Sequence, residues 1–286
     1  PAVVAQKRGC EMGRNQEQAD YDRQAYALAV EYLSSVCNVP LEVIERHINP
    51  TIERVRTLNA VYERLLQSAQ SAGMSPQVIG GSIGGLSNLG KVLFNFDPKL
   101  VAEKYTGGWE PVFDDIKREL KPRGRLRMQA TSRWPLFCRS ILSGARFLSQ
   151  FNSAEEFYNW ADTLYEDDST RMALPVALSK KIDGLGFALS CSFLKELGYL
   201  KYGKPDTHLR AIFTALGLTR SQNDLDLHAA IVRIAENAGV TPYSVDMLYW
   251  LIGSGSLYLD DIKIGSQRER FVEYARSRLN SLPASL

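Results

Sequence analysis

The sequence predicts an all-α fold, and three observations support this prediction. Apolar residues recur at helical spacing through residues 17–70 and again from residue 133 onward. The segments between these runs carry Gly, Pro, Asn, Asp or Ser, which are typical of helix starts and ends. Strands are expected to be short, near residues 77–83 or 257–264.

The expected elements follow in chain order. Residues 17–70 are predicted to be helical, with breaks at Pro40 and at Asn49-Pro50. Residues 80–90 are too rich in glycine for a helix, and a mixed segment follows them. Ser153 and Thr241 are well placed to cap helices. From residue 133 on, short helices are expected over residues 133–150, 154–166, 170–182, 187–198, 206–217, 224–238, 242–252 and 266–281.

Composition limits the functional classes. A chain of 286 residues with 45% hydrophobic residues can bury one large core or two modest ones, so disorder is not expected. Lys and Arg number 34 against 32 for Asp and Glu, a net charge of +2. This balance does not by itself indicate nucleic acid, so only local clustering of basic residues can do so.

The cysteines and the hydropathy point to an intracellular protein. Cys10, Cys37, Cys138 and Cys191 form no Cys-x-x-Cys pair, so neither a zinc site nor an iron–sulfur cluster is indicated, and no metal or cofactor is expected. Free thiols suit a reducing cytoplasm. No segment approaches the roughly 20 apolar residues that span a bilayer, and no signal peptide is evident. A cytoplasmic location without a membrane partner is therefore expected.

Residues 170–198 are expected to form a helix, a tight turn and a second helix. Gly184 and Gly186 flank Leu185, so the backbone can turn sharply and approach a partner closely. The second helix begins at the turn, where unpaired amides and the positive end of the helix dipole can hold a phosphate oxygen. Lys180 and Lys181 lie just before the turn. By itself this pattern fits a structural helical hairpin as well.

The following segment, Lys204-Pro205-Asp206-Thr207-His208, strengthens the functional interpretation. Together with the hairpin it resembles the helix-hairpin-helix DNA glycosylases, the HhH-GPD or endonuclease III-like superfamily. In that family a Gly-Val-Gly hairpin precedes a Val-Asp-Thr-His segment at a similar spacing. Residues 139–147 resemble the helix that opens the same domain. The resemblance covers residues 130–255 and implies a base-processing domain over residues 116–286, with residues 1–115 as an added helical region.

The resemblance assigns roles to particular residues. Asp206 would be the catalytic carboxylate at the mouth of a pocket for a flipped-out nucleotide, where it stabilises positive charge on the deoxyribose or activates water. The alternative interpretation of Asp206 is a helix N-cap, and both roles are compatible. The residues expected to bind DNA are Gly184, Leu185, Gly186, Lys180, Lys181, Lys204 and His208.

Three departures from the family pattern bear on the chemistry. Ala188 occupies the position of the lysine that forms a Schiff base in bifunctional members, and neither Phe187 nor Leu189 can replace it. A β-lyase step is therefore not expected. Ala145 replaces an expected Gln, and the carboxy-terminal cysteine cluster of many relatives is missing. These departures argue against ordinary repair specificity.

Three features look more like a divergent branch than like the repair enzymes: the large amino-terminal region, the segment Lys-Pro-Asp-Thr-His-Leu at residues 204–209, and the run Thr-Pro-Tyr-Ser-Val-Asp-Met-Leu-Tyr-Trp-Leu-Ile-Gly-Ser-Gly at residues 241–255. That branch is the group of predicted alpha-glutamyl/putrescinyl thymine pyrophosphorylases, linked to bacteriophage DNA hypermodification. It implies transfer of an amino acid or amine onto an activated 5-hydroxymethylpyrimidine in double-stranded DNA, in the bacterial host cytoplasm if the chain is phage-encoded. Excision of a modified base by a monofunctional glycosylase is the second hypothesis, and a non-catalytic DNA-binding module is the third.

Other motifs have weaker interpretations. The sequence Gly85–Lys91 has P-loop spacing, but Val92 stands where Ser or Thr would bind magnesium, so nucleotide hydrolysis is not favoured. Residues 253–256 fit either an active-site loop or a helix-ending turn. Two basic groups could contact phosphates or form solvated faces: Lys117, Arg118, Lys121, Arg123, Arg125 and Arg127, and then Arg268, Arg270, Arg276 and Arg278.

Overall fold

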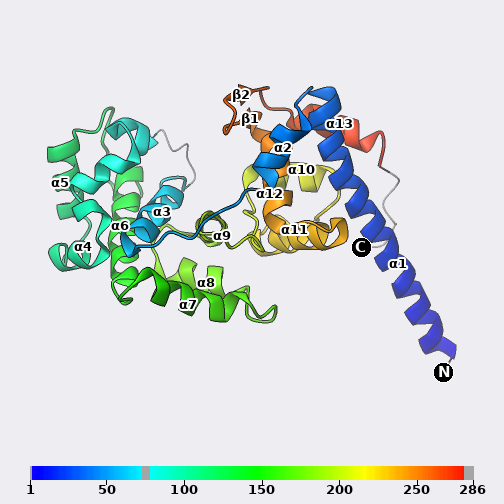
Figure 1. The fold of residues 1–286 in the computed structure, drawn as a ribbon, viewed down its shortest axis with the longest axis horizontal. Helices are drawn as coiled ribbons and strands as arrows, with labels where there is room; N and C mark the ends of the chain where they lie inside the picture. Colours follow the sequence, from blue (N-terminus) through cyan, green and yellow to red (C-terminus); the bar gives the residue numbers. More distant parts are fainter. Residues whose placement is uncertain (1, 73–77, 280–286) are drawn as a thin grey trace. The chain divides into compact units, whose positions relative to one another are not determined.

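The chain is all-α, as the helical spacing predicts (Figure 1). The structure is a computed structural model and describes residues 2–72 and 78–279. Within these residues the strands are a single antiparallel pair, β1 (Ser256–Leu257) and β2 (Ile262–Lys263). The strands expected near residues 257–264 are therefore present. The alternative location near residues 77–83 is wrong from residue 78 on, because Gly80–Ile83 forms a 3-10 turn, and residue 77 lies outside the described residues.

The chain divides into two compact units, one combining Pro1–Thr51 with Leu200–Leu286 and the other spanning Ile52–Tyr199. These bounds differ from the predicted division at residue 115. The early and late segments of the first unit are in contact at Asp22, which is fully buried and accepts hydrogen bonds from Arg233 (2.8 Å) and Asn237 (2.7 Å). A functional domain that begins at residue 116 stays a prediction.

The unit Ile52–Tyr199 is built around one central helix, α6 (Arg133–Leu148). The packing is close: a Cβ on Gly144 of α6 would lie 3.0 Å from the side chain of Leu65, and the Tyr62 hydroxyl donates to the Ile141 carbonyl at 2.6 Å. Its other helices are α3 (Leu58–Ala69), η3 (Gly80–Ile83), η4 (Leu86–Lys91), η5 (Phe94–Phe96), α4 (Pro98–Lys104), α5 (Glu110–Leu120), α7 (Ala154–Tyr165), α8 (Ala173–Lys181) and α9 (Phe187–Glu196). Helices α3, α4, α5 and α8 all contact α6.

The other unit is built around α12 (Pro242–Ser254), which is buried on nearly every side. The apolar run of residues 243–252 explains this burial, because a helix that is hydrophobic all round needs neighbours on all faces. Helices on several sides contact α12, and the unit comprises α1 (Ala2–Glu31), η1 (Tyr32–Val36), α2 (Leu41–Ile48), α10 (Thr207–Ala215), α11 (Asp224–Ala238), α13 (Arg268–Arg276), β1 and β2.

The eight helices expected from residue 133 on are present, and seven of them lie within three residues of their predicted bounds. The last was expected over residues 266–281, but α13 ends at Arg276, and residues 280 and 281 lie outside the described residues. The capping signals are confirmed as well. The Ser153 side chain accepts from the Glu156 N–H (3.1 Å), which caps α7, and the Glu156 carboxylate accepts from the Asn152 N–H (2.7 Å), one residue before the N-cap. The Thr241 side chain accepts from the Ser244 N–H at 3.1 Å.

The region before residue 133 departs more from the prediction. Residues 51–55 carry no helix although their apolar spacing predicts one, and the next helix, α3, begins only after Thr57, which caps it. The glycine-rich segment forms 3-10 turns instead of a loop without helix. Helices α4 and α5 were not predicted, although Asp97 caps α4 and a proline lies in the first turn of each.

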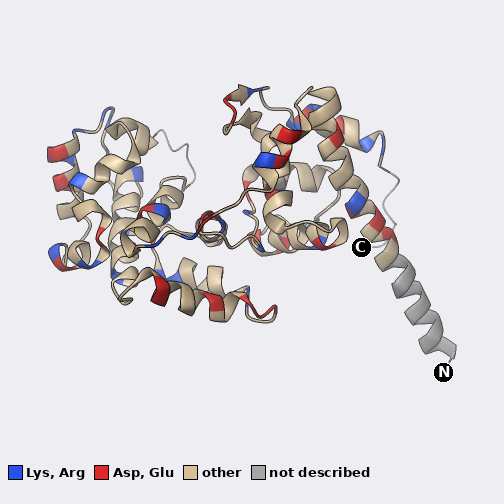
Figure 2. Ribbon diagram, viewed as in Figure 1, with Lys and Arg blue, Asp and Glu red and all other residues tan. Residues whose placement is uncertain are grey.

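Charge is mixed along both units, with Lys and Arg interspersed among Asp and Glu on most helices (Figure 2). Within residues 2–72 and 78–279, every helix is too short or too polar to span a bilayer. The basic residues therefore indicate a binding site for an anionic partner only where they gather without acidic neighbours.

Candidate functional site

The predicted hairpin forms between α8 and α9. Gly184 adopts a left-handed conformation (φ +76°), which glycine tolerates best. The Leu185 N–H donates to the Ile182 carbonyl at 3.2 Å, and the Leu185 side chain is only 1% exposed. The apolar residue between the glycines thus anchors the turn in the core and leaves both glycines at the surface.

Helix α6 supports this turn through two serines. The Asp183 N–H donates to the Ser143 hydroxyl at 2.9 Å. A Cβ on Gly184 would lie 2.6 Å from the Ser140 hydroxyl oxygen, which is closer than real Cβ contacts. Gly184 is therefore required both by its backbone conformation and by its approach to α6.

Gly186 differs from Gly184 in both respects. Its φ is −61°, which any residue adopts, and no atom lies within 4 Å of the position of an added Cβ. Nothing in the described chain therefore requires glycine at residue 186. Open space at an exposed glycine that caps α9 leaves room for a partner to approach the first turn of that helix, whose amides lack intrahelical acceptors.

The residues around the turn carry both signs of charge. Lys180 and Lys181 end α8 and are exposed, as expected for phosphate contacts. Asp183 is also exposed and lies next to Gly184, so it would oppose an anion on that side. Ala188, at the position of the family's lysine, is half-buried in the first turn of α9 and offers no nucleophile.

Asp206 caps α10. Its Oδ1 accepts from the N–H groups of His208 (2.8 Å) and Leu209 (3.0 Å), so the N-cap interpretation is confirmed as geometry. The described residues donate no hydrogen bond to Oδ2. This oxygen is the part of the carboxylate that can act on a substrate, while Oδ1 fixes its orientation.

The surroundings of Asp206 disfavour its charged form. Burial raises the pKa of the Asp206 carboxyl above its usual value, and the negative charge of Asp246 raises it further, against the lowering effects of the Leu209 amide, Lys204 and His208. Asp246 lies on α12, is 1% exposed, and accepts from the Lys204 N–H at 2.8 Å. A carboxyl with a raised pKa is a common feature of catalytic sites.

Lys204 is held by its backbone, and His208 is held by the packing of its side chain. The backbone of Lys204 is fixed by Asp246, and its side chain is half-buried. The His208 ring packs against α12: a Cβ on Gly253 would lie 2.5 to 2.6 Å from three atoms of that side chain. His208 Nδ1 is buried and makes no hydrogen bond to the described residues. A DNA contact by either side chain stays a prediction.

The hairpin belongs to the unit Ile52–Tyr199, and Asp206 belongs to the other unit. Within each unit the structure adds residues that the sequence prediction missed. These are Ser140 and Ser143 beneath the hairpin, and Asp246 and Gly253 beside the Asp206 segment. Asp246 had a detectable signal, because it is a single carboxylate within the apolar run 243–252.

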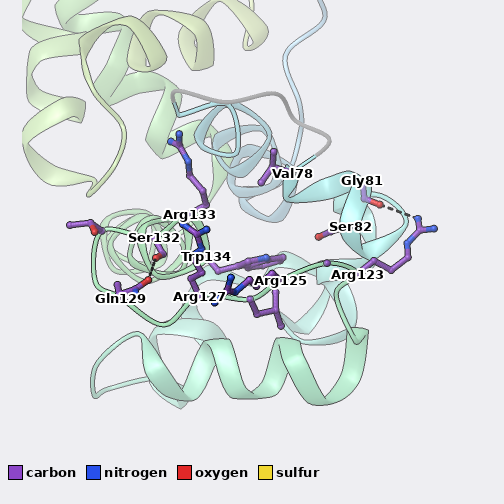
Figure 3. A pocket seen from close by; sticks show the side chains of 13 residues that line it. Val78, Gly81, Ser82, Arg123, Arg125, Arg127, Gln129, Ser132, Arg133 and Trp134 are labelled. Carbon is purple, nitrogen blue, oxygen red and sulfur yellow. Dashed lines mark hydrogen bonds between the residues drawn. The ribbon is translucent and has the colours of Figure 1, made fainter.

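The first basic group separates into two sets. Arg118 forms ion pairs with Asp115 (2.5 Å) and Glu119 (2.9 Å) on its own helix, so it is part of a neutralised surface. In contrast, Arg123, Arg125 and Arg127 line a cavity (Figure 3).

In the second group, Arg276 donates to the Ala215 carbonyl at 2.8 Å, and Arg278 lies 3.8 Å from the Tyr274 ring centre. These two arginines are therefore engaged within the chain.

The two weaker motifs have structural roles. The P-loop-like segment Gly85–Lys91 forms 3-10 turns. Gly255 has a φ of +66° and ends α12, so residues 253–256 form a helix-ending turn.

No family model matches the sequence, and no curated protein matches it significantly. Among solved structures, the chain is similar to the 8-oxoguanine glycosylase/lyase of Methanocaldococcus jannaschii, in complex with a 15mer DNA containing 8-oxoguanine. The TM-score is 0.49 at 14% identity, over 78% of this chain and 94% of that chain. Similarity at this level does not transfer an activity from one protein to the other.

Proposed function

We propose that the chain is a DNA-processing enzyme of the helix-hairpin-helix type, with the hairpin holding the DNA backbone and Asp206 acting on a flipped-out nucleotide. One observation carries the proposal. The turn has an inner glycine fixed against α6 and an outer glycine, Gly186, that the fold itself does not need. Space kept free of a side chain beside exposed helix amides suits close approach of a phosphate.

Chemistry on a base in a duplex requires the nucleotide to leave the stack, at a cost of a few kcal/mol that backbone contacts offset. Asp206 would then act through Oδ2. Its Oδ1 is held by two amides of α10, so the carboxylate keeps one orientation. Reduced solvation at Asp206 strengthens its interaction with positive charge on the substrate.

The reaction we favour is transfer of an amine or amino acid onto an activated 5-hydroxymethylpyrimidine. The amine nitrogen bonds to the methylene carbon, the leaving group departs with its electron pair, and Asp206 accepts the proton that the nitrogen loses. A raised pKa makes the carboxylate of Asp206 a better base than that of an ordinary aspartate. The support is the resemblance of the segments at residues 204–209 and 241–255 to that branch.

Monofunctional excision of a modified base is the second candidate. Ala188 favours it over a bifunctional glycosylase, because no amine is present in the first turn of α9 to form a Schiff base. In this reaction Asp206 would stabilise the sugar cation or activate water, and an abasic site would be the product.

The two reactions differ in their products. Duplex DNA carrying a modified pyrimidine is incubated with the protein, with and without an amine such as glutamate or putrescine, and its nucleosides are analysed by mass spectrometry. A heavier nucleoside with an intact glycosidic bond supports transfer, and abasic sites support excision. Asp206→Asn should abolish either product and retain DNA affinity. If the wild-type protein binds DNA and yields neither product, the hairpin serves a non-catalytic binding module.

A further inference from the structure

A cavity of about 1120 Å³ lies at the amino-terminal end of α6 (Figure 3). Arg125 and Arg127, on the irregular segment before α6, line it together with Arg123 and Arg133. Trp134 lines it as well and is held from behind by the rings of Phe113 and Phe137, each 6.1 Å away. The cavity therefore has an arginine-rich rim and a packed aromatic wall.

Among the described residues, the lining of this cavity contains four arginines and no Asp or Glu. Arg123 donates to the Gly81 carbonyl at 3.2 Å, and Arg133 donates to the Ala72 carbonyl at 3.1 Å. Arg125 and Arg127 are exposed and make no hydrogen bond or ion pair with the described part of the chain. Each guanidinium has five N–H donors, so most of the donors around the cavity are available to an anion.

The same helix connects this cavity to the hairpin. Arg133 and Ser140 are seven residues apart on α6, so they lie on one face, within about 20° of each other and about 10 Å apart along the axis. Ser140 is the residue against which Gly184 packs. Arg133 and the hairpin support thus share one face of α6, and the other three arginines lie on the segment that leads into this helix, within the same unit.

We propose that this arginine cavity binds phosphates of the DNA segment that the hairpin holds, and so extends the DNA contact along α6. The inference rests on the proposed function, and it assigns DNA contacts to Arg123, Arg125 and Arg127, which lie outside residues 130–255, the part of the chain that the family resemblance covers. Four arginines without an acidic neighbour in the lining favour an anionic partner, and guanidinium groups bind phosphates in a bidentate manner. The arginines are spread along the chain from residue 123 to residue 133 around a cavity of about 1120 Å³, which gives room for more than one phosphate.

The test measures the salt dependence of DNA binding. Binding of a short labelled duplex is followed by fluorescence anisotropy between about 50 and 200 mM salt. The double variant Arg125→Gln/Arg127→Gln should lower the magnitude of the slope of log K against log salt by about 1.8, that is, about 0.9 for each phosphate that the variant no longer neutralises. The matched control is Lys117→Gln/Lys121→Gln, which removes two exposed charges outside the cavity lining and should leave the slope nearly unchanged.

The outcomes separate the inference from the proposed function. If Gly186→Ala weakens DNA binding but the double variant Arg125→Gln/Arg127→Gln has the salt dependence of the wild type, the proposed function stands and the inference is wrong. If the wild-type protein does not bind the duplex, both are wrong. If the double variant loses binding of ATP but keeps the wild-type salt dependence of DNA binding, the cavity binds a small phosphate ligand and the inference is also overturned. Circular dichroism of the arginine variant confirms that it is folded.

Discussion

The buried carboxylate of Asp246 raises the pKa of Asp206, and it also accepts a hydrogen bond from the backbone two residues before Asp206. The packing around this segment is tight, since a Cβ on Gly203 would lie 2.7 Å from Ile231 and 3.2 Å from the Asp246 Cβ. Asp246 therefore influences both the position and the protonation of the proposed catalytic residue.

The first prediction concerns Asp246→Asn, which retains an oxygen acceptor for the Lys204 amide and removes the charge. The pKa of Asp206 should fall, because the second-largest cause of its rise is gone, while desolvation, the largest cause, stays. The acid limb of the activity profile should therefore move to lower pH. An acid limb at an unchanged pH, with the variant folded, would show that Asp246 has only a structural role.

The second prediction concerns the stability of Asp206→Asn. With a raised pKa, the folded protein binds more protons than the unfolded chain between pH 3.8 and the raised value. The free energy of unfolding of the wild type therefore decreases as the pH rises through this window. Asn caps helices about as well as Asp. In urea unfolding at neutral pH the variant should be at least as stable as the wild type. In activity assays it should be inactive. A clear loss of stability would contradict the direction of the pKa shift.

The third prediction contrasts the two hairpin glycines. Gly186→Ala should leave the melting temperature unchanged, because its φ is −61° and the added Cβ meets no atom, yet it should weaken DNA binding about tenfold or more. Gly184→Ala should cost about 1 to 2 kcal/mol for the left-handed backbone alone, and the approach to Ser140 adds to this. Equal DNA affinity of Gly186→Ala and the wild type would remove the hairpin from the interface.

How much the sequence could predict differs between the two ends of the chain. After residue 133, apolar spacing and caps such as Ser153 define each helix locally, so the helices and the hairpin turn were predicted closely. The division into units depends on contacts between distant residues, such as Asp22 with Arg233, which no local pattern indicates. The 3-10 turns over residues 80–96 bury apolar residues that do not recur at helical spacing. Apolar spacing therefore does not predict these turns.

The same distinction applies to the site. Gly184, Gly186 and Asp206 form motifs that are visible in the sequence, whereas Ser140 supports the hairpin from 44 residues away in the chain. The partition of the basic group was likewise not predictable. Arg118 is neutralised by acids on its own helix, and Arg125 faces a cavity that exists only once residues 78–82 fold against it.

The fourth prediction tests how His208 is positioned. Gly253→Ala places a methyl group within 2.6 Å of three atoms of the His208 side chain, and the nearest is its Cβ, so α10 or α12 must shift. We expect a destabilisation of about 1 to 3 kcal/mol and reduced activity. The double variant Gly253→Ala/His208→Gly removes all three atoms that the methyl group meets, so it should recover stability relative to the sum of the two single variants. No recovery would place the strain elsewhere in α12.

The fifth prediction concerns His228, which is 1% exposed. Burial lowers its pKa to about 4, and the nearby Asp246 opposes this only in part. Between pH 6.5 and 4 the His228 imidazole is therefore protonated in the unfolded chain but neutral in the folded protein. The free energy of unfolding decreases as the pH falls through this window. A drop from 6.5 to about 4 corresponds to about 3 kcal/mol. His228→Phe should remove this part of the acid dependence in urea unfolding at several pH values, whatever its stability at neutral pH. The same acid dependence in variant and wild type would show that His228 is not the titrating group.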